Sequence, residues 1–184
     1  MSIALLKEIG DLQREQQAIG EQFSKLYDAR KQKTIEKAVS DFVDFFTTQG
    51  FDVNRTVSAK RIEASYGKFF VGMSVPDVKD DFFGAITVFS LDTSLLEKHQ
   101  YTVAVRRKGS VISVSCGTVR AQTDEDEKER QEIEKLKKDI ESLKNRVQSF
   151  NTEEWLYEVY EGKRNPNSVR NFTSMKELLD VLVK

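Results

Sequence analysis

The chain has 184 residues, enough for one domain or for one domain with an appendage. Hydrophobic residues make up 39% and charged residues 32%, a balance that fits a protein with much exposed helix surface. The 29 basic and 30 acidic residues nearly cancel, which excludes a global field that would recruit nucleic acid or an anionic membrane.

Cysteine usage and the N-terminal sequence indicate a compartment. Cys116 is the only cysteine, so no disulfide can form within the chain and a reducing environment is expected. Charges interrupt the opening SIALLKEIGDL, which does not fit a signal peptide. No apolar run approaches the roughly 20 residues that span a bilayer. We therefore expect a soluble, cytoplasmic protein without membrane contact.

The first thirty residues carry an apolar stripe with heptad spacing, which predicts a helix that faces a partner helix. The stripe consists of Leu5, Ile9, Leu12, Gln16, Ile19, Phe23 and Leu26. Arg30 and Lys33 then occupy its next positions and the heptad frays. Gln16 either fixes the register of the helix pair or is simply tolerated. Residues 1–50 are expected to form this arm and its extension.

The extension of this helix has a different character. A dense apolar face from Ile35 to Phe46 predicts packing into a globular core, and Gly50 is the expected stop of a helix over 2–48.

A second heptad helix is predicted within residues 123–150. Its stripe residues are Ile133, Leu136, Ile140, Leu143 and Val147. Acidic residues gather near its start and basic residues near its end, as the helix dipole favours. We expect the two arms to pair antiparallel across the intervening domain or to associate with another copy, and a dimeric four-helix bundle is attractive.

Residues 51–122 alternate with period two and predict an antiparallel β domain. Its expected strands are 53–58, 60–65, 68–75, 84–91, 100–107 and 110–118. The last two form a predicted hairpin about Lys108 and Gly109, with Val105 opposite Ile112. Residues 75–84 are expected to form a loop, and 92–100 a short linking helix.

The C-terminal segment, 151–184, is predicted to hold two short helices that dock elsewhere. Asn151 and Glu154 have capping-box spacing before a helix to Tyr160, and Ser174 and Glu177 before the last one. The fold class is therefore α+β, with a central antiparallel sheet domain flanked by two coiled-coil-forming helices.

Catalytic and metal-binding signals are weak. His99 is the only histidine, which excludes histidine-rich metal sites, and no G-x-S-x-G element accompanies it. Cys116 is interpreted as a small buried hydrophobe. Asp77, Asp80 and Asp81 could hold a hard cation, although a solvated acidic turn is the commoner outcome of such spacing. We expect no enzyme, metal or cofactor.

Two basic groups are candidates for nucleic-acid binding. Arg106, Arg107 and Lys108 surround the predicted hairpin tip, and the second group is Lys163, Arg164 and Arg170. Basic side chains also protect sheet edges from unwanted pairing, so both readings stay open.

Two resemblances accompany these patterns. The helix–sheet–helix order is similar in outline to a prefoldin subunit, although its β segment is longer and 151–184 have no counterpart there. The stretch IGDLQRE (9–15) resembles a coiled coil of Mu-type Gam proteins, which shield DNA ends. Neither resemblance assigns site residues.

These patterns favour a non-enzymatic adaptor. We expect a homo-oligomer, with a dimer favoured, that presents its β domain and C-terminal helices to a protein partner through coiled-coil arms. The alternative is a nucleic-acid-binding protein that uses the basic hairpin tip.

Overall fold

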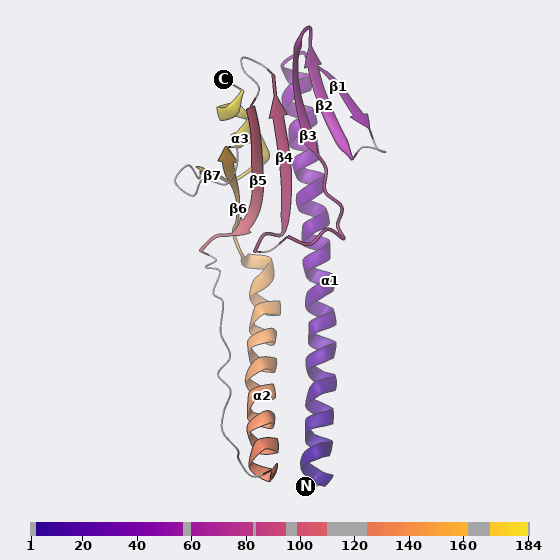
Figure 1. The fold of residues 1–184 in the computed structure, drawn as a ribbon, viewed down its shortest axis with the longest axis vertical. Helices are drawn as coiled ribbons and strands as arrows, with labels where there is room; N and C mark the ends of the chain where they lie inside the picture. The colour runs from indigo at the N-terminus through magenta and orange to yellow at the C-terminus, as the bar shows by residue number, and fades with distance from the viewer. Residues whose placement is uncertain are drawn as a thin grey trace. The chain divides into compact units, whose positions relative to one another are not determined.

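The computed structural model of the protein describes residues 3–56, 60–82, 84–94, 99–109, 125–161 and 170–183. The chain divides into two compact units. The helical unit comprises residues 1–28 and 112–153, and the sheet unit comprises residues 29–111 and 154–184. Helix α1, Ile3–Thr48, contributes to both units (Figure 1).

The helical unit contains the first part of α1 and helix α2, Glu125–Ser149, which is followed by the 3₁₀ turn η1, Phe150–Thr152. Ile9, Ile133 and Leu136 form a buried cluster, and the partly buried Leu5 and Leu12 pack against it. Near its end the aromatic rings of Phe23, Tyr27 and Phe150 meet. The heptad stripes of the two helices therefore contact each other within one chain.

Two ion pairs give the relative direction of these helices. Lys137 Nζ lies 2.8 Å from Glu8 Oε1, and Lys144 Nζ lies 2.6 Å from Glu15 Oε1. Each pair is one heptad further along both helices, so α1 and α2 run in the same direction. The expected antiparallel pairing is wrong, because these ion pairs and the cluster of Ile9, Ile133 and Leu136 bring the starts of α1 and α2 together.

The sheet unit is a mixed α+β structure built on a seven-stranded antiparallel sheet in sequence order. Its strands are β1 Asp52–Thr56, β2 Arg61–Tyr66, β3 Phe69–Ser74, β4 Thr87–Thr93, β5 His99–Arg107, β6 Trp155–Glu161 and β7 Arg170–Phe172. The first five confirm the strands predicted between residues 53 and 107. Residues 110–118 lie outside the residues that the structure describes, as do 95–98 of the predicted linking helix 92–100. Both ends of that predicted helix are strand instead, because Asp92 and Thr93 belong to β4 and His99 and Gln100 to β5.

Strand β6 corrects one prediction. Residues 155–160 form a strand and not a helix, and η1 occupies the position of the expected capping box. Trp155, Leu156, Val159 and Tyr160 fit a helical stripe, but seven residues of β6 pair with β5, from Tyr101 opposite Glu161 to Arg107 opposite Trp155. Strand β5 thus pairs with β4 on one edge and β6 on the other, so β6 replaces the hairpin partner expected from 110–118.

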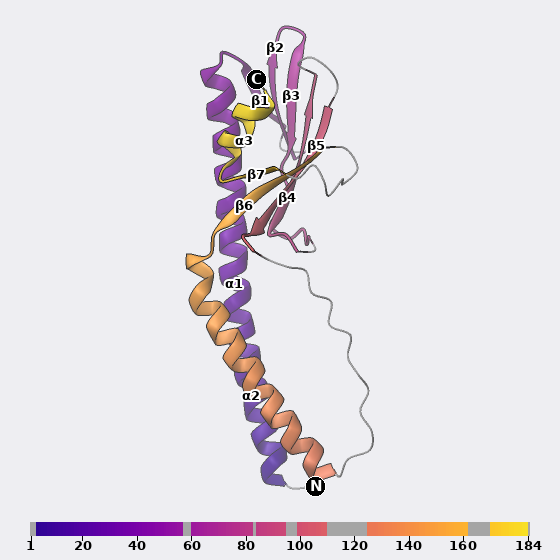
Figure 2. The same ribbon diagram turned by 90° about the vertical axis from the view of Figure 1, so that its left-hand side faces the viewer.

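One face of the sheet, here called the covered face, carries most of the core, and a smaller cluster of Ala85, Ala104 and Tyr160 lies on the other side. Helix α3, Met175–Leu182, and the second part of α1 lie on this face (Figure 2). Ile35, Ala38, Phe42 and Phe46 of α1 are buried, as are Met175, Leu178 and Leu179 of α3. The strands contribute alternating residues such as Ile62, Met73, Phe89, Val103 and Val159.

Both predicted caps of these helices form. Ser174 Oγ accepts a hydrogen bond from the backbone N–H of Glu177 at 3.1 Å. Gly50 has φ of +81°, and the N–H groups of Gly50 and Phe51 donate to the carbonyls of Thr47 and Phe46. This is a Schellman motif, and its expected apolar contact is the Phe46–Phe51 ring pair at 5.2 Å.

The opposite sheet face carries a charged network. Arg61 on β2 reaches across β3 to Asp92 on β4 and also contacts Glu63 Oε1 at 2.7 Å. Its path passes over Gly72, where an added Cβ would overlap the guanidinium group. Hydrogen bonds to Asp92 first, and to Glu63 second, raise the pKa of Arg61.

Candidate functional site

The heptad stripe is the first candidate surface. Ile9, Ile133, Leu136 and Ile140 are buried, with 5 to 8% of their surface exposed. The other stripe residues remain half-buried: Leu5, Leu12, Gln16, Ile19, Phe23, Leu26, Leu143 and Val147. Beside the stripe, 44% of Leu6 and 85% of Ile3 are exposed. One chain therefore covers its own stripe only in part.

The basic residues expected at the hairpin tip lie at the end of β5. Arg106 Nε is 3.3 Å from Glu158 Oε2, and Lys108 Nζ is 2.6 Å from Glu154 Oε2. This contact lowers the pKa of Glu154. Arg107 is exposed. Carboxylates therefore offset the charges of Arg106 and Lys108, which leaves less positive charge for a phosphate backbone.

The second basic group is only partly described. Arg170 is exposed at the start of β7. Lys163 and Arg164 lie outside the described residues, as does Cys116. Arg170 is therefore the one member of this predicted group that the structure describes.

The acidic turn is held by its own side chains. Asp77 accepts hydrogen bonds from the backbone N–H of Lys79 at 3.1 Å and from Lys60 Nζ at 3.1 Å, and both lower its pKa. Asp80 accepts a bond from the backbone N–H of Asp77 at 2.8 Å. Within the described part of the chain, no three acidic, histidine or cysteine residues are placed to hold a metal ion.

His99 lies at the start of β5 and not on a linking helix. Its Nδ1 is 3.2 Å from Glu161 Oε1 on the neighbouring strand β6. This cross-strand contact gives the histidine a structural role in the sheet.

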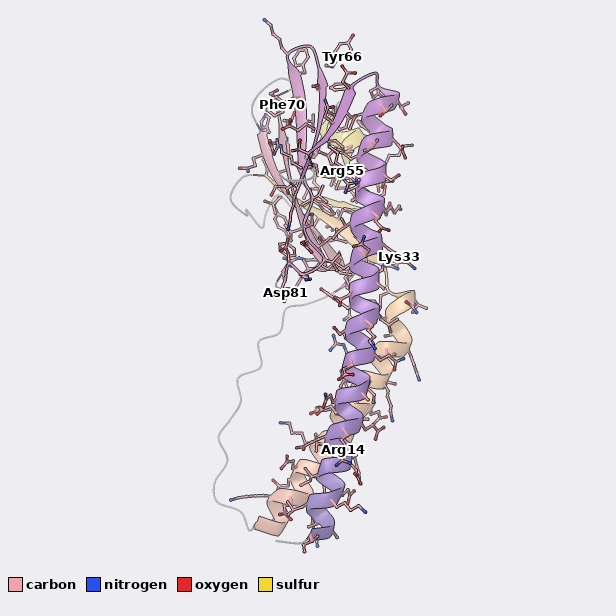
Figure 3. The ribbon with its side chains drawn as sticks, turned by 90° about the vertical axis from the view of Figure 1, so that its right-hand side faces the viewer. Arg14, Lys33, Arg55, Tyr66, Phe70 and Asp81 are labelled. Carbon is pink, nitrogen blue, oxygen red and sulfur yellow. The ribbon has the colours of Figure 1, made fainter. Side chains whose placement is uncertain are left out.

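The turn between β2 and β3 presents aromatic side chains. Tyr66, Phe69 and Phe70 are exposed by 60, 46 and 37%. Tyr66 and Phe70 project from the β2–β3 end of the sheet in Figure 3. Tyr66 also contacts Phe51, with ring centroids 5.6 Å apart. Aromatic residues are enriched at binding hot spots, so this turn, here called the aromatic turn, is a candidate contact surface.

A basic pocket lies in the sheet unit, between α1 and the β5–β6 strands. Its volume is about 230 Å³, and its lining residues are Arg30, Lys33, Thr34, Lys37, Val105, Trp155, Tyr157 and Thr173. Positions 30, 33, 34 and 37 fall on one helix face because they are three or four residues apart. The pocket thus combines three cations, three hydroxyl groups and two aromatic side chains.

Electrostatics distinguish this basic pocket from the other charged surfaces. No carboxylate lines it, and Arg30, Lys33 and Lys37 have no ion pair with any residue that the structure describes. A like-charged pair at i,i+4, such as Lys33 and Lys37, costs a helix about 0.2–0.5 kcal/mol. Burial first, and the charge of Asp41 second, raise the pKa of Tyr157 to about 12, while the charge of Arg30 opposes the rise.

The sequence contained a signal for this pocket that we interpreted only as the end of the heptad. Arg30 and Lys33 replace apolar residues at the next stripe positions, and Lys37 continues the same face. What could not be read from the sequence is that Trp155 and Tyr157, more than a hundred residues away, complete the walls.

Comparisons with known proteins assign no function to these surfaces. No family model, curated protein or solved structure matches the chain. Among the residues that the structure describes, no helix is long and apolar enough to cross a membrane.

Proposed function

We propose that the protein is a non-enzymatic interaction protein that assembles as a homodimer through its helical unit. In this proposal α1 and α2 form a parallel coiled coil, and two such pairs associate as a four-helix bundle. The observation that carries it is the heptad stripe, of which eight residues stay half-buried when only one chain is present.

The ion pairs support the coiled-coil register. Ile9 of α1 and Ile133 of α2 belong to the same buried cluster and are taken as matching heptad positions. Glu8 then directly precedes Ile9, and Lys137 follows Ile133 by four residues. This is the flanking-charge relation expected of parallel coiled coils, and Glu15 with Lys144 repeats it one heptad later. Gln16 would then face Ile140, where a polar side chain sets register at some cost in stability.

The energetic reason for dimerisation is the remaining apolar surface. Covering it contributes about 25 cal/mol per Å² of apolar area removed from water. Ile19, Leu26, Leu143 and Val147 are half-buried in one chain and gain the rest of this contribution only when further helices approach. A second copy supplies the matching stripe by symmetry.

The sheet unit provides the partner-binding end of this proposal. Tyr66, Phe69 and Phe70 of the aromatic turn offer a protein partner exposed rings of the kind that dominate interface energetics. We also propose a cytoplasmic location, which agrees with the single cysteine.

Molar mass in solution tests the assembly. The wild type is expected at twice the chain mass of 21.1 kDa by light scattering coupled to size exclusion. Ile19→Lys should shift the mass towards the monomer, because a charge in the stripe cannot be desolvated. Ala18→Lys, on the neighbouring exposed position, is the matched control and should remain dimeric. A wild type that is monomeric at every concentration would overturn the proposal.

Nucleic-acid binding by Arg106, Arg107 and Lys108 remains the alternative. It predicts affinity that falls steeply with salt and that decreases in an Arg106→Ala, Arg107→Ala variant. The ion pairs of Arg106 with Glu158 and Lys108 with Glu154 weigh against it. Absent or salt-insensitive binding to DNA and RNA would remove it.

A further inference from the structure

The basic pocket of the sheet unit brings together three positive charges that form no ion pair with any residue that the structure describes. Several basic side chains elsewhere in the described chain meet carboxylates, as in the pairs Lys60–Asp77, Arg61–Asp92 and Lys108–Glu154. Arg30, Lys33 and Lys37 have no such partner. Lys33 lies on the part of α1 that belongs to the sheet unit (Figure 3). An anion would relieve the repulsion among these three groups.

Two acidic groups outside the lining interact with lining residues: Glu177 with Thr173, and Asp41 with Tyr157 through its charge. Glu177 accepts hydrogen bonds from the hydroxyl of Thr173 at 2.7 Å and from its backbone N–H at 2.8 Å, and these bonds lower its pKa. Asp41 follows Lys37 by one helical turn and is not among the lining residues. Neither carboxylate forms an ion pair with the three cations.

The donors in the pocket have the chemistry of a phosphate site. A guanidinium group binds phosphate through two parallel N–H donors, and lysines add point charges. Three cations favour a dianion over a monoanion. The volume of about 230 Å³ is below the roughly 300 Å³ of sites for whole drug-sized ligands, so it suits a single group.

We propose that this pocket binds a phosphate monoester dianion through Arg30, Lys33 and Lys37, with Trp155 and Tyr157 beside the group that carries the phosphate. The monoester belongs either to a small molecule or to a phosphorylated side chain. The competing explanation is that the lysine stems merely cover the strands while their ammonium groups stay in water, in which case no ligand is selected.

Trp155 gives a direct measurement, because it is the only tryptophan and it lines the pocket. Tryptophan fluorescence of the full chain is titrated with inorganic phosphate, phenyl phosphate and chloride at constant ionic strength. We expect saturable changes with both phosphates, with a Kd of about 1 mM or below for phenyl phosphate, and none with chloride. Phosphate should also protect Trp155 from quenching by iodide but not by neutral acrylamide.

Matched variants separate a built site from general salt effects. A triple variant should weaken phenyl phosphate binding at least about tenfold, because each lost charged hydrogen bond is costly. It carries Arg30→Gln, Lys33→Gln and Lys37→Gln. A control triple variant removes the same charge from exposed positions outside the pocket, through Lys7→Gln, Lys25→Gln and Lys68→Gln. It should bind phenyl phosphate as the wild type does. Equal loss in both variants, or no saturable binding by the wild type, would overturn the proposal.

Further ligands identify the source of the monoester. Tighter binding of a phosphoserine or phosphotyrosine peptide than of free phosphate would place the group on a protein. Equal binding of inorganic phosphate, phenyl phosphate and the peptides would indicate a small phosphorylated ligand. The last ligand is an oligonucleotide whose phosphates are all internal diesters. If it binds more tightly than every monoester, the assignment is overturned. The pocket lies in the sheet unit, so these measurements test phosphate binding independently of dimerisation through the helical unit.

Discussion

Gly72 shows how one missing side chain permits a network of three charges. Arg61 can cross β3 only because residue 72 has no Cβ, and on the far side its Nη1 lies 3.2 Å from Asp92 Oδ1. The backbone of Gly72 is not in the left-handed region, so its role is to leave space and not to relieve strain. The Arg61 and Asp92 side chains are 29 and 32% exposed, so their ion pair contributes modestly.

A double-mutant cycle tests this role. Gly72→Ala should lower the free energy of unfolding by about 1 kcal/mol, because the methyl group displaces Arg61. In an Arg61→Ala background the same change should be neutral or stabilise by about 0.4–1 kcal/mol, because alanine restricts the unfolded chain. Urea unfolding of the four proteins measures both values. Additive effects would show that Arg61 does not depend on the gap.

Tyr157 predicts a loss of stability in alkaline solution. Its phenol is buried and its pKa is about 12, against an ordinary value of 10.0, so the folded protein favours the neutral form. The sheet unit should therefore keep its full stability below pH 10 and lose about 2–3 kcal/mol as pH rises from 10 to 12. Tyr157→Phe should remove this part of the decline. Thermal unfolding at pH 8 to 12 makes the comparison, and identical pH profiles would contradict the assignment.

At the scale of elements, the direction of α2 decides which residues meet. Leu12 packs against the cluster of Ile9, Ile133 and Leu136, so the starts of α1 and α2 lie together. An antiparallel pair would instead bring Leu5 towards Val147, near the end of α2. Disulfide formation distinguishes the two arrangements, because it requires Cα atoms within about 7 Å.

Cysteine cross-linking in a Cys116→Ser background is therefore informative. Leu12→Cys with Leu136→Cys should oxidise readily within one chain, as seen by faster migration on a non-reducing gel. Leu5→Cys with Val147→Cys should stay reduced under the same conditions. The reverse result would show that the helices run in opposite directions.

Each of the two units has its own main apolar core among the residues that the structure describes. One is the cluster between α1 and α2, and the other lies between the sheet and its covering helices. If the helical unit is stabilised by dimerisation, its unfolding depends on protein concentration, whereas unfolding of the sheet unit does not.

Two spectroscopic probes should separate these transitions. Helical circular dichroism reports strongly on both helices, while Trp155 fluorescence reports on the sheet unit alone. We expect the first transition to move to higher denaturant as protein concentration increases and the fluorescence transition to stay fixed. Coincident, concentration-independent transitions would instead indicate one cooperative monomer.

The sequence by itself determined the features that depend on neighbouring residues. The heptad stripes, the glycine stop at Gly50, the cap at Ser174 and five strands are local patterns of spacing and backbone preference, and the structure contains each of them.

Only the tertiary structure decided which elements meet. WLYEVYE has apolar residues compatible with a helix or a strand, and its pairing with β5 makes it β6. The direction of α2 is seen only in contacts between residues more than a hundred positions apart, such as Lys137 and Glu8. The basic pocket likewise joins α1 to Trp155 and Tyr157. Such choices rest on long-range packing and charge, which no local pattern encodes.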